Sequence, residues 1–473
     1  MTATGRPDII AEPVVGVPSQ RESRWLIALV FIGIALRLMV LLIRADDLKT
    51  DPDAYVGIAQ TVVDGNGLCV PGSDRPTAFR PPLYPLLLAG LTLTGLTLTC
   101  AAGLINLLSG AVVIIATWRV ARLAALRGGW VVAATAAATL DPLLLRYSAL
   151  PMTESMSAAL LTVAMLQILR LCEKQSADSV RSGLQPAILA GCCFGLAGLC
   201  RPVGLMTCAA ITLVLLLVAV KQTRNRTPEA TVRCSAGDID RDRFVRGVCI
   251  AVLPAVVAGL VLLPWVVRNA VQFGYFIPAT THGGYTLLLG NNPVFYREVV
   301  KAPGQPAWQG GSLDKWQQRV DSEILVNGIQ ATDDVAIDAW KYKRALTNIG
   351  QQPGTFLQAC LLRWKRFWAL RPSVTDTELP VLVAAAVTIW YAGLWLGLGR
   401  SLFCADIRRS GHIQLLWMAI LSFLLLHTFY WTNARMRAPL TGVIVVLSVV
   451  GWQAIFGHLF RRDRGVTVNT DAS

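Results

Sequence analysis

Ten apolar runs dominate the sequence, and each is long enough to serve as a membrane span. A spanning helix needs about 20 mostly apolar residues, and somewhat shorter runs serve inside a bundle. The runs cover residues 25–43, 101–118, 129–147, 154–170, 186–200, 203–220, 247–267, 384–400, 413–431 and 438–458. The sequence therefore predicts an all-α polytopic membrane protein with about ten transmembrane helices.

The composition agrees with a chain that lies mostly in lipid. Only 15% of the 473 residues are charged, whereas a soluble protein of this size has about 25%. This deficit excludes a disordered protein, a nucleic-acid-binding domain and an ordinary cytosolic enzyme. The net charge of +14 is therefore attributed to interaction with membrane lipids rather than with nucleic acid.

The basic residues predict how the chain is oriented. Loops rich in Lys and Arg stay cytoplasmic, and an N-terminus placed inside puts 22 of them in inner segments. Both tails, residues 1–24 and 459–473, are then cytoplasmic, and the protein lies in the cytoplasmic membrane. This parity makes residues 81–97 an interfacial or re-entrant helix, although an ordinary short span is the alternative.

Two long segments are left on the outer face. One is the loop 44–100, and the other is the segment 268–383, which is too long for a connector and is expected to form a domain or half-domain. Within the second, residues 354–370 mix Trp, Phe and Leu with Arg and Lys, so a helix there is expected to lie along the membrane surface. The cysteines lack metal-binding spacing and are expected to be packing residues.

The loop 44–100 opens with TDPDAYVGIAQTVV, whose apolar residues recur at helical spacing from Tyr55 onward. Asp51 is interpreted in two ways. It can cap this short helix, with Pro52 at the first helical position. Alternatively, Asp51 or Asp53 is a carboxylate held ionised at the water–lipid boundary, where it accepts a proton from an incoming hydroxyl. Capping and catalysis are compatible, so both roles stay open.

Two further charged residues stand at sites where burial is costly. Arg80 directly precedes a pair of prolines, so its backbone is expected to be extended and conformationally restricted. It is suited to a lipid phosphate, or to orienting an acidic group or a lipid-linked phosphate. Glu154 stands at the lip of an apolar span, where a carboxylate is either a helix-start acid or a functional group.

Three arginines lie at the predicted outer ends of spans, where the charge rule does not place them: Arg201, Arg435 and Arg437. An arginine at such a depth needs an anion. A polyprenyl phosphate is one candidate, and ordinary lipid head groups or backbone carbonyls are the other. Arg268 and Asn269, which end the seventh run, are weaker candidates for the same role.

Several short motifs then suggest a family. In chain order they are the Asp-to-Tyr spacing at 51–55, DGNGL, RPPLYPLLLA, the TE pair at 153–154, GLCRP ending at Pro202, PWVVRN at 264–269 and NARMRAPL at 433–440. This arrangement resembles the bacterial relatives of dolichyl-phosphate-mannose protein mannosyltransferases and of the aminoarabinose transferases that modify lipid A. These are integral-membrane glycosyltransferases of the GT-C fold, and the resemblance covers roughly residues 25–445.

The resemblance assigns roles to the acidic residues. Asp51 matches the catalytic acid of the first outer loop by its distance from Tyr55, but Pro52 replaces the second acid of the family pair and Asp53 follows. We therefore favour Asp51 over Asp53. Glu154 matches the second carboxylate, and an Arg80–Glu154 pair is expected, with Asp141 as an alternative partner for Arg80.

The resemblance also assigns the substrate contacts. Tyr55 and Arg80 are expected to contact substrate, and Arg201, Arg435 and Arg437 to bind the donor phosphate. A divalent metal is not required, although an ion between Asp51 and Glu154 is compatible with the sequence.

The predicted function is transfer of a sugar from a polyprenyl-phosphate carrier to an unidentified acceptor at the outer face, by one inverting displacement. Residues 25–267 are then the catalytic transmembrane module and residues 384–458 the C-terminal membrane helices. The segment 268–383 is expected to serve the acceptor through its turns at 281–285 and 290–293, with His282 as a loop residue. The alternatives are a transporter or flippase of lipid-linked sugars, and a non-catalytic scaffold.

Overall fold

The computed structural model describes residues 19–175, 180–224, 236–302, 308, 310–371 and 380–462. Nine helices in these ranges are long and apolar enough to cross a membrane. They are α1 (Gln20–Ile43), α4 (Leu98–Leu123), α7 (Glu154–Gln175), α8 (Val180–Cys200), α9 (Val203–Arg224), α10 (Ala236–Phe273), α16 (Val381–Phe403), α18 (Gly411–Phe429) and α19 (Thr441–Arg462), the last preceded by the 3-10 helix η4 (Ala434–Leu440). The chain is therefore an all-helical, multi-pass membrane protein.

The predicted run 129–147 is not one continuous helix. It consists of α5 (Gly129–Thr139) and α6 (Pro142–Tyr147), which are separated at Asp141. Asp141 caps α6, because its Oδ1 accepts a hydrogen bond from the Leu144 N–H at 2.9 Å, and Pro142 has no N–H with which to continue α5. The predicted run is therefore a broken helix, as Pro142 suggested, since these two residues end one helix and begin the next.

Small residues bring the long helices close together. In the bundle, α7 packs against both α4 and α8, α8 packs against α10, and α16 packs against α19. At the crossing of α16 and α19, a Cβ atom on Gly451 would lie 1.8 Å from the carbonyl oxygen of Gly397. Only glycine fits this crossing, as is common where membrane helices pack on each other.

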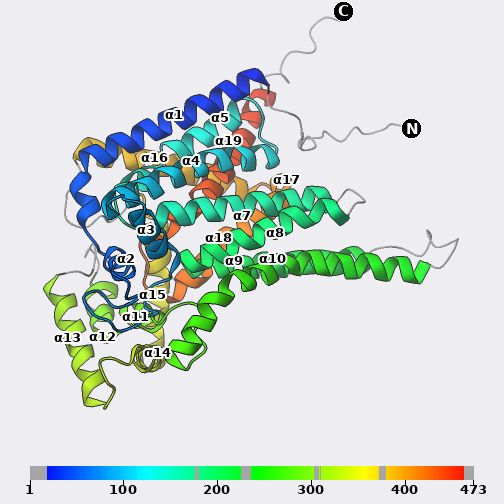
Figure 1. Ribbon diagram of the computed structural model, residues 1–473. Helices are drawn as coiled ribbons and strands as arrows, with labels where there is room; N and C mark the ends of the chain where they lie inside the picture. The colour runs from blue at the N-terminus through cyan, green and yellow to red at the C-terminus, as the bar shows by residue number, and fades with distance from the viewer. Residues whose placement is uncertain are drawn as a thin grey trace, which may run out of the picture.

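The shorter elements gather at one end of the bundle. In Figure 1, α2 (Tyr55–Val63) lies at this end together with α11 (Gly283–Gly290), α12 (Pro293–Phe295), α13 (Gly311–Val326) and α14 (Asp334–Gln351). At the opposite end, α1 begins and α19 ends (Figure 1). Loop 44–100 therefore lies next to segment 268–383.

Loop 44–100 contains two further short helices, η1 (Ala45–Lys49) and α3 (Leu83–Leu93). With 11 residues, α3 is about 16 Å long, which is half the thickness of the hydrocarbon core. It is apolar but too short to cross alone. It packs against α2 and α4 instead, and its Tyr84 and Leu88 are buried.

Segment 268–383 has an apolar core of its own. Besides α11 to α14 it holds the π-helix η3 (Tyr296–Val300) and α15 (Pro353–Phe367), while the short α17 (Ala405–Arg408) lies between α16 and α18. Phe295, Trp308 and Trp316 pack together in that core. On α15, Leu357, Leu361 and Trp364 are exposed, whereas Ala359, Arg363 and Phe367 on the opposite face are buried. The helix is thus two-faced, with large apolar side chains on its exposed face. That it lies along the membrane surface stays a prediction.

Candidate active site

Five charged side chains from five separate elements meet where loop 44–100 joins the bundle. Asp53 directly precedes α2, and Arg80 lies just before α3. Glu154 is the first residue of α7, Arg201 lies in the turn between α8 and α9, and Arg435 belongs to η4. We call these five residues the charge cluster.

Asp53 is held in the cluster by the backbone beside it. Ala54 has a φ of 60°, a left-handed conformation that costs a non-glycine residue about 1 kcal/mol. Beyond this turn, Asp53 Oδ1 accepts from Arg80 Nη2 at 3.1 Å, and Oδ2 accepts from Arg435 Nη2. Arg80 Nε also donates to the Asp53 carbonyl at 2.7 Å. Burial alone would raise the pKa of Asp53, but the charges of Arg435 and Arg80 outweigh it and lower that pKa to about 2.

Glu154 is fully buried and bridged by two guanidinium groups. Its Oε1 accepts from Arg201 Nη1 at 2.5 Å and from Arg435 Nε. Its Oε2 has no hydrogen-bond partner in the part of the chain that the structure describes. Arg435 thus joins both carboxylates, and three cations face two anions. The cluster therefore holds one positive charge in excess.

Asp51 lies outside this cluster. Its two carboxylate oxygens accept from the N–H groups of Val56 at 3.0 Å and Gly57 at 2.8 Å, so the exposed Asp51 satisfies donors in the first turn of α2. The N-cap position is Ala54 and α2 begins at Tyr55, so the prediction that Pro52 is the first helical residue was wrong. The ion considered between Asp51 and Glu154 does not suit this arrangement. Glu154 Oε1 lies between two guanidinium groups, whose charge repels a cation.

The cluster pairs Arg80 differently from the expected Arg80–Glu154 pair. Arg80 binds Asp53, and its guanidinium lies over the rings of Tyr55 at 5.6 Å and Phe79 at 4.9 Å. Tyr55 itself is buried against Tyr84, with 5.4 Å between ring centroids. The expected pair therefore does not form, although Arg80 does contribute to the same cluster as Glu154.

Arg437 also lies apart from the cluster, inside the bundle. Its Nη1 donates to the Phe367 carbonyl at 2.6 Å, and its guanidinium lies over the rings of Tyr391 at 4.4 Å and Trp395 at 5.1 Å. Asp141, the alternative partner of Arg80, accepts from the Tyr391 hydroxyl at 3.3 Å. The structure thus gives both residues partners within the protein.

Arg268 and Asn269 hold neighbouring backbone segments against the end of α10. Arg268 donates to the carbonyls of Thr77 at 2.9 Å and Leu68 at 3.0 Å. The buried Asn269 donates to the Ile277 carbonyl at 3.1 Å. Arg268 also donates to Asn269 Oδ1 at 3.0 Å. Arg268 therefore fastens loop 44–100 to the end of α10, and Asn269 fastens the chain that follows α10.

Two contacts of the cluster were not foreseen from the sequence. The Arg435 guanidinium lies 5.9 Å from the ring centroid of Tyr147, and Arg201 Nη2 donates to the sulfur of Met436 at 3.3 Å. Tyr147 ends the broken run 129–147, so its position depends on the break at Asp141. Met436 offered a weak signal, because it lies between the two arginines of the NARMRAPL motif.

Comparison with known proteins gives a fold. No protein-family model matches the chain, and no curated protein sequence matches it. Among solved structures, the archaeal oligosaccharyltransferase AglB from Archaeoglobus fulgidus, in complex with an inhibitory peptide and a dolichol-phosphate, matches with a TM-score of 0.52 at 14% identity. A second structure of that enzyme, tethered to an acceptor peptide, matches with a TM-score of 0.53 at 14% identity.

The matches cover 96% of this chain but 53% of the oligosaccharyltransferase, so the chain spans about half the length of that enzyme. ArnT from Cupriavidus metallidurans in the apo state matches with a TM-score of 0.40 at 16% identity, over 94% of this chain and 80% of that one. The likeness to the oligosaccharyltransferase, with TM-scores above 0.5, shows that the chain has the GT-C fold.

Proposed function

We propose that the chain is a glycosyltransferase that moves a sugar from a polyprenyl-phosphate carrier to an acceptor at the outer face of the cytoplasmic membrane. The observation that carries this proposal is the charge cluster, in which three arginines and two carboxylates meet at one end of a GT-C bundle. Support comes from the matching oligosaccharyltransferase, which is described in complex with a dolichol-phosphate.

The donor phosphate is assigned to Arg201 and Arg435. Their side chains are 14% and 19% exposed, so each keeps a part that an incoming group can reach. The excess positive charge of the cluster favours an anion, and guanidinium groups bind phosphate oxygens with two parallel hydrogen bonds. A lipid-linked phosphate suits this position, because its polyprenyl tail can remain among the membrane helices.

Asp53 is assigned the role of general base in place of Asp51. The acceptor hydroxyl attacks the anomeric carbon, its proton passes to the Asp53 carboxylate, and the bond from that carbon to the phosphate oxygen breaks. The phosphate leaves with the electron pair, and the configuration inverts. Arg201 and Arg435 stabilise the charge that grows on the departing phosphate.

The pKa of Asp53 fits this role only when the donor is bound. A carboxylate with a pKa of about 2 is a weak base, because the ideal base titrates nearer to the working pH. Arg435 is the main cause of that low value among the neighbouring charges. A phosphate that engages Arg435 offsets its charge and so raises the basicity of Asp53. Donor binding thereby prepares the base.

The donor assignment is tested by native mass spectrometry of the purified protein with undecaprenyl phosphate. Arg435→Gln and Arg201→Gln are each expected to weaken binding by roughly 10- to 100-fold, since a hydrogen bond to a charged group contributes about 1.5–3 kcal/mol. Arg297→Gln is the matched control, because Arg297 is exposed and pairs only with the neighbouring Glu298 among the described residues. Thermal unfolding of each variant verifies that it is folded. Unchanged affinity in both cluster variants would contradict the assignment.

A further inference from the structure

The position of Arg435 in the charge cluster depends on the chain that leads into η4. Helix α18 ends at Phe429 and η4 begins at Ala434, so residues 430–433 form a short connector outside both helices. Arg435 is the second residue of η4. A connector lacks the repeating backbone hydrogen bonds that fix a helix. The contacts made by this connector therefore decide where Arg435 lies.

Segment 268–383 binds the chain on both sides of the junction between α18 and the connector. The Trp431 N–H donates to the Thr286 carbonyl, in α11, at 3.2 Å. Directly after α11, Asn291 Nδ2 donates to the Phe429 carbonyl at 2.9 Å. These two bonds come from neighbouring parts of the same outer segment, so they hold the start of the connector against it.

Two further contacts keep the connector close to the outer segment. The hydroxyls of Tyr430 and of Tyr342, on α14, form a hydrogen bond at 3.2 Å. The other contact requires glycine, because a Cβ atom on Gly290 would lie 3.0 Å from the Trp431 nitrogen. Three successive residues ahead of η4 are thus bonded to segment 268–383.

Arg363, on α15, is the buried centre of these contacts and is only 1% exposed. Its Nη1 donates to the Thr428 carbonyl near the end of α18 at 2.8 Å. Its Nη2 donates to Asn291 Oδ1 at 2.8 Å and to the Gly290 carbonyl. A guanidinium can only donate hydrogen bonds, so it holds the Asn291 amide with its oxygen toward Arg363 and its nitrogen toward the Phe429 carbonyl. Arg363 therefore binds the end of α18 both directly and through Asn291.

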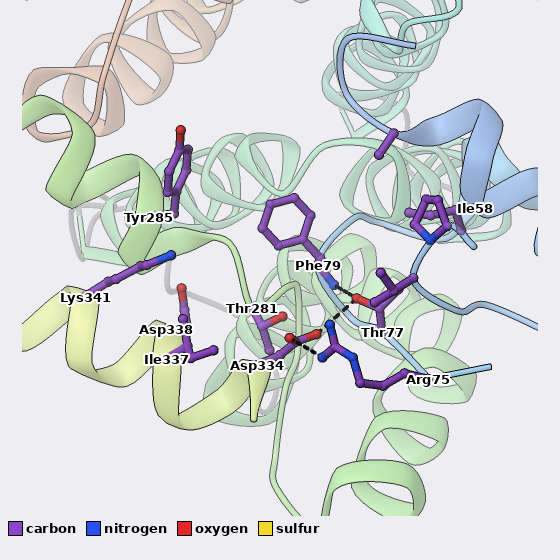
Figure 2. A pocket seen from close by; sticks show the side chains of 13 residues that line it. Ile58, Arg75, Thr77, Phe79, Thr281, Tyr285, Asp334, Ile337, Asp338 and Lys341 are labelled. Atoms are coloured by element: carbon purple, nitrogen blue, oxygen red, sulfur yellow. Dashed lines mark hydrogen bonds and ion pairs between the residues drawn. The ribbon is translucent and has the colours of Figure 1, made fainter. Parts of the chain in front are cut away.

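The same outer segment is fastened to the loop on the other side of the charge cluster. In the lining of the cavity shown in Figure 2, Arg75 Nη1 donates to Asp334 of α14 at 2.6 Å, and Thr77 Oγ1 donates to the same carboxylate at 3.2 Å. Arg75 and Thr77 belong to loop 44–100, which supplies Asp53. One segment therefore holds the carriers of both partners in the ion pair between this aspartate and its bridging arginine.

We infer that segment 268–383 positions Arg435 for the reaction and that Arg363 is its main positioning residue. Among the described residues, Arg363 bonds to no member of the charge cluster, so it acts through the end of α18 and Asn291. This inference rests on the proposed function, because it takes Arg435 as a ligand of the donor phosphate. It gives the outer segment a part in donor binding, in addition to the acceptor role expected from the sequence.

The test is a double-mutant cycle on the affinity of the purified full-length protein for undecaprenyl phosphate, measured by native mass spectrometry. Arg363→Met keeps an unbranched side chain but removes its donors, so it is expected to weaken binding by about tenfold. In the Arg435→Gln background the same change is expected to weaken binding by less than about twofold, because the residue through which it acts is already lost. Equal losses in both backgrounds overturn the inference, because a purely structural role lowers the affinity in both alike.

Lys365→Met is the matched control, since Lys365 is exposed on the same helix. It is expected to leave the affinity for undecaprenyl phosphate within about twofold of wild type. Thermal unfolding verifies that each variant is folded. If Arg363→Met does not fold, Tyr342→Phe decides instead, because it removes one hydroxyl bonded to the connector and leaves Arg363 in place. Tyr342→Phe is expected to weaken binding by about two- to fivefold, and wild-type affinity in this variant then overturns the inference.

Arg435→Gln alone separates this inference from the proposed function. If that variant binds undecaprenyl phosphate as tightly as wild type, the donor assignment fails. Chemical unfolding of the same proteins then decides the positioning role, since the bonds of Arg435 to the two carboxylates also contribute to stability. The double variant Arg363→Met with Arg435→Gln is expected to lose less stability than the sum of the two single variants. Additive losses overturn the positioning role.

Discussion

Substituting Asp53 by asparagine tests the centre of the proposed mechanism. The amide keeps an oxygen for Arg80 or Arg435 but cannot accept the proton of an acceptor, so turnover is expected to fall by about 10²- to 10⁴-fold. The structure also predicts a stability effect. The pKa of Asp53 falls from 3.8 to about 2, which corresponds to about 2 kcal/mol in favour of the folded state at neutral pH. The assay is release of polyprenyl phosphate from a polyprenyl-phosphate-linked sugar, in membranes that contain the natural acceptor.

The matched variant is Asp51→Asn, which differs by two positions in the same loop. Asp51 accepts two backbone N–H bonds, and its amide replacement keeps one acceptor oxygen, so a loss of about 1 kcal/mol in stability is expected. Turnover should stay within about tenfold of wild type, which corresponds to 1.4 kcal/mol in the barrier. If Asp53→Asn retains turnover while Asp51→Asn abolishes it, the base is Asp51 and the reasoning from the cluster is refuted.

Three further predictions follow from the same contacts. The free energy of unfolding of wild type should exceed that of Asp53→Asn by its full amount above about pH 4, and this difference should be lost as pH falls through about 2. The reason is that the folded protein binds the Asp53 proton more weakly than the unfolded chain does. Thermal unfolding of both proteins across this pH range checks the prediction. Arg437→Gln should lower the unfolding midpoint by several degrees, as it removes a buried bond to Phe367, yet leave undecaprenyl phosphate affinity within about twofold in native mass spectrometry. Gly451→Ala should destabilise the protein by about 1–3 kcal/mol in chemical denaturation, since its methyl group would overlap the Gly397 carbonyl.

The membrane helices could be predicted from the sequence because lipid imposes a simple length rule. Nine long helices in the described chain fall on the predicted apolar runs, since a span needs about 20 apolar residues. The exception is the run 129–147, where Asp141 and Pro142 end one helix and begin another. Hydropathy averages over such a run and does not register that a cap and a proline interrupt its backbone hydrogen bonds.

The charge cluster could be predicted only in part. Glu154, Arg201 and Arg80 were selected because charged groups near lipid need partners, but the choice of Asp51 over Asp53 rested on spacing alone. The left-handed conformation of Ala54 lies between Asp53 and α2. An alanine does not predict such a conformation, so the position of Asp53 in the cluster could not be predicted from the residue types.

The two arginines of η4 illustrate the same limit. Arg435 and Arg437 are two residues apart and look equivalent in the sequence, yet a 3-10 helix has three residues per turn, so they point in different directions. Arg435 joins the carboxylates and Arg437 enters the core. The sequence identifies both residues as basic, but it does not show that their side chains point in different directions.

The order in which the cluster residues are synthesised has a consequence for biogenesis. Asp53 and Glu154 emerge from the ribosome early, whereas Arg435, which bridges them, comes just before the final helix. A nascent chain that has already inserted the eight earlier long helices of the described ranges therefore still lacks the cation that bridges its two acids. We expect the charge cluster to close in a single late step of insertion, when Arg435 joins the two acids.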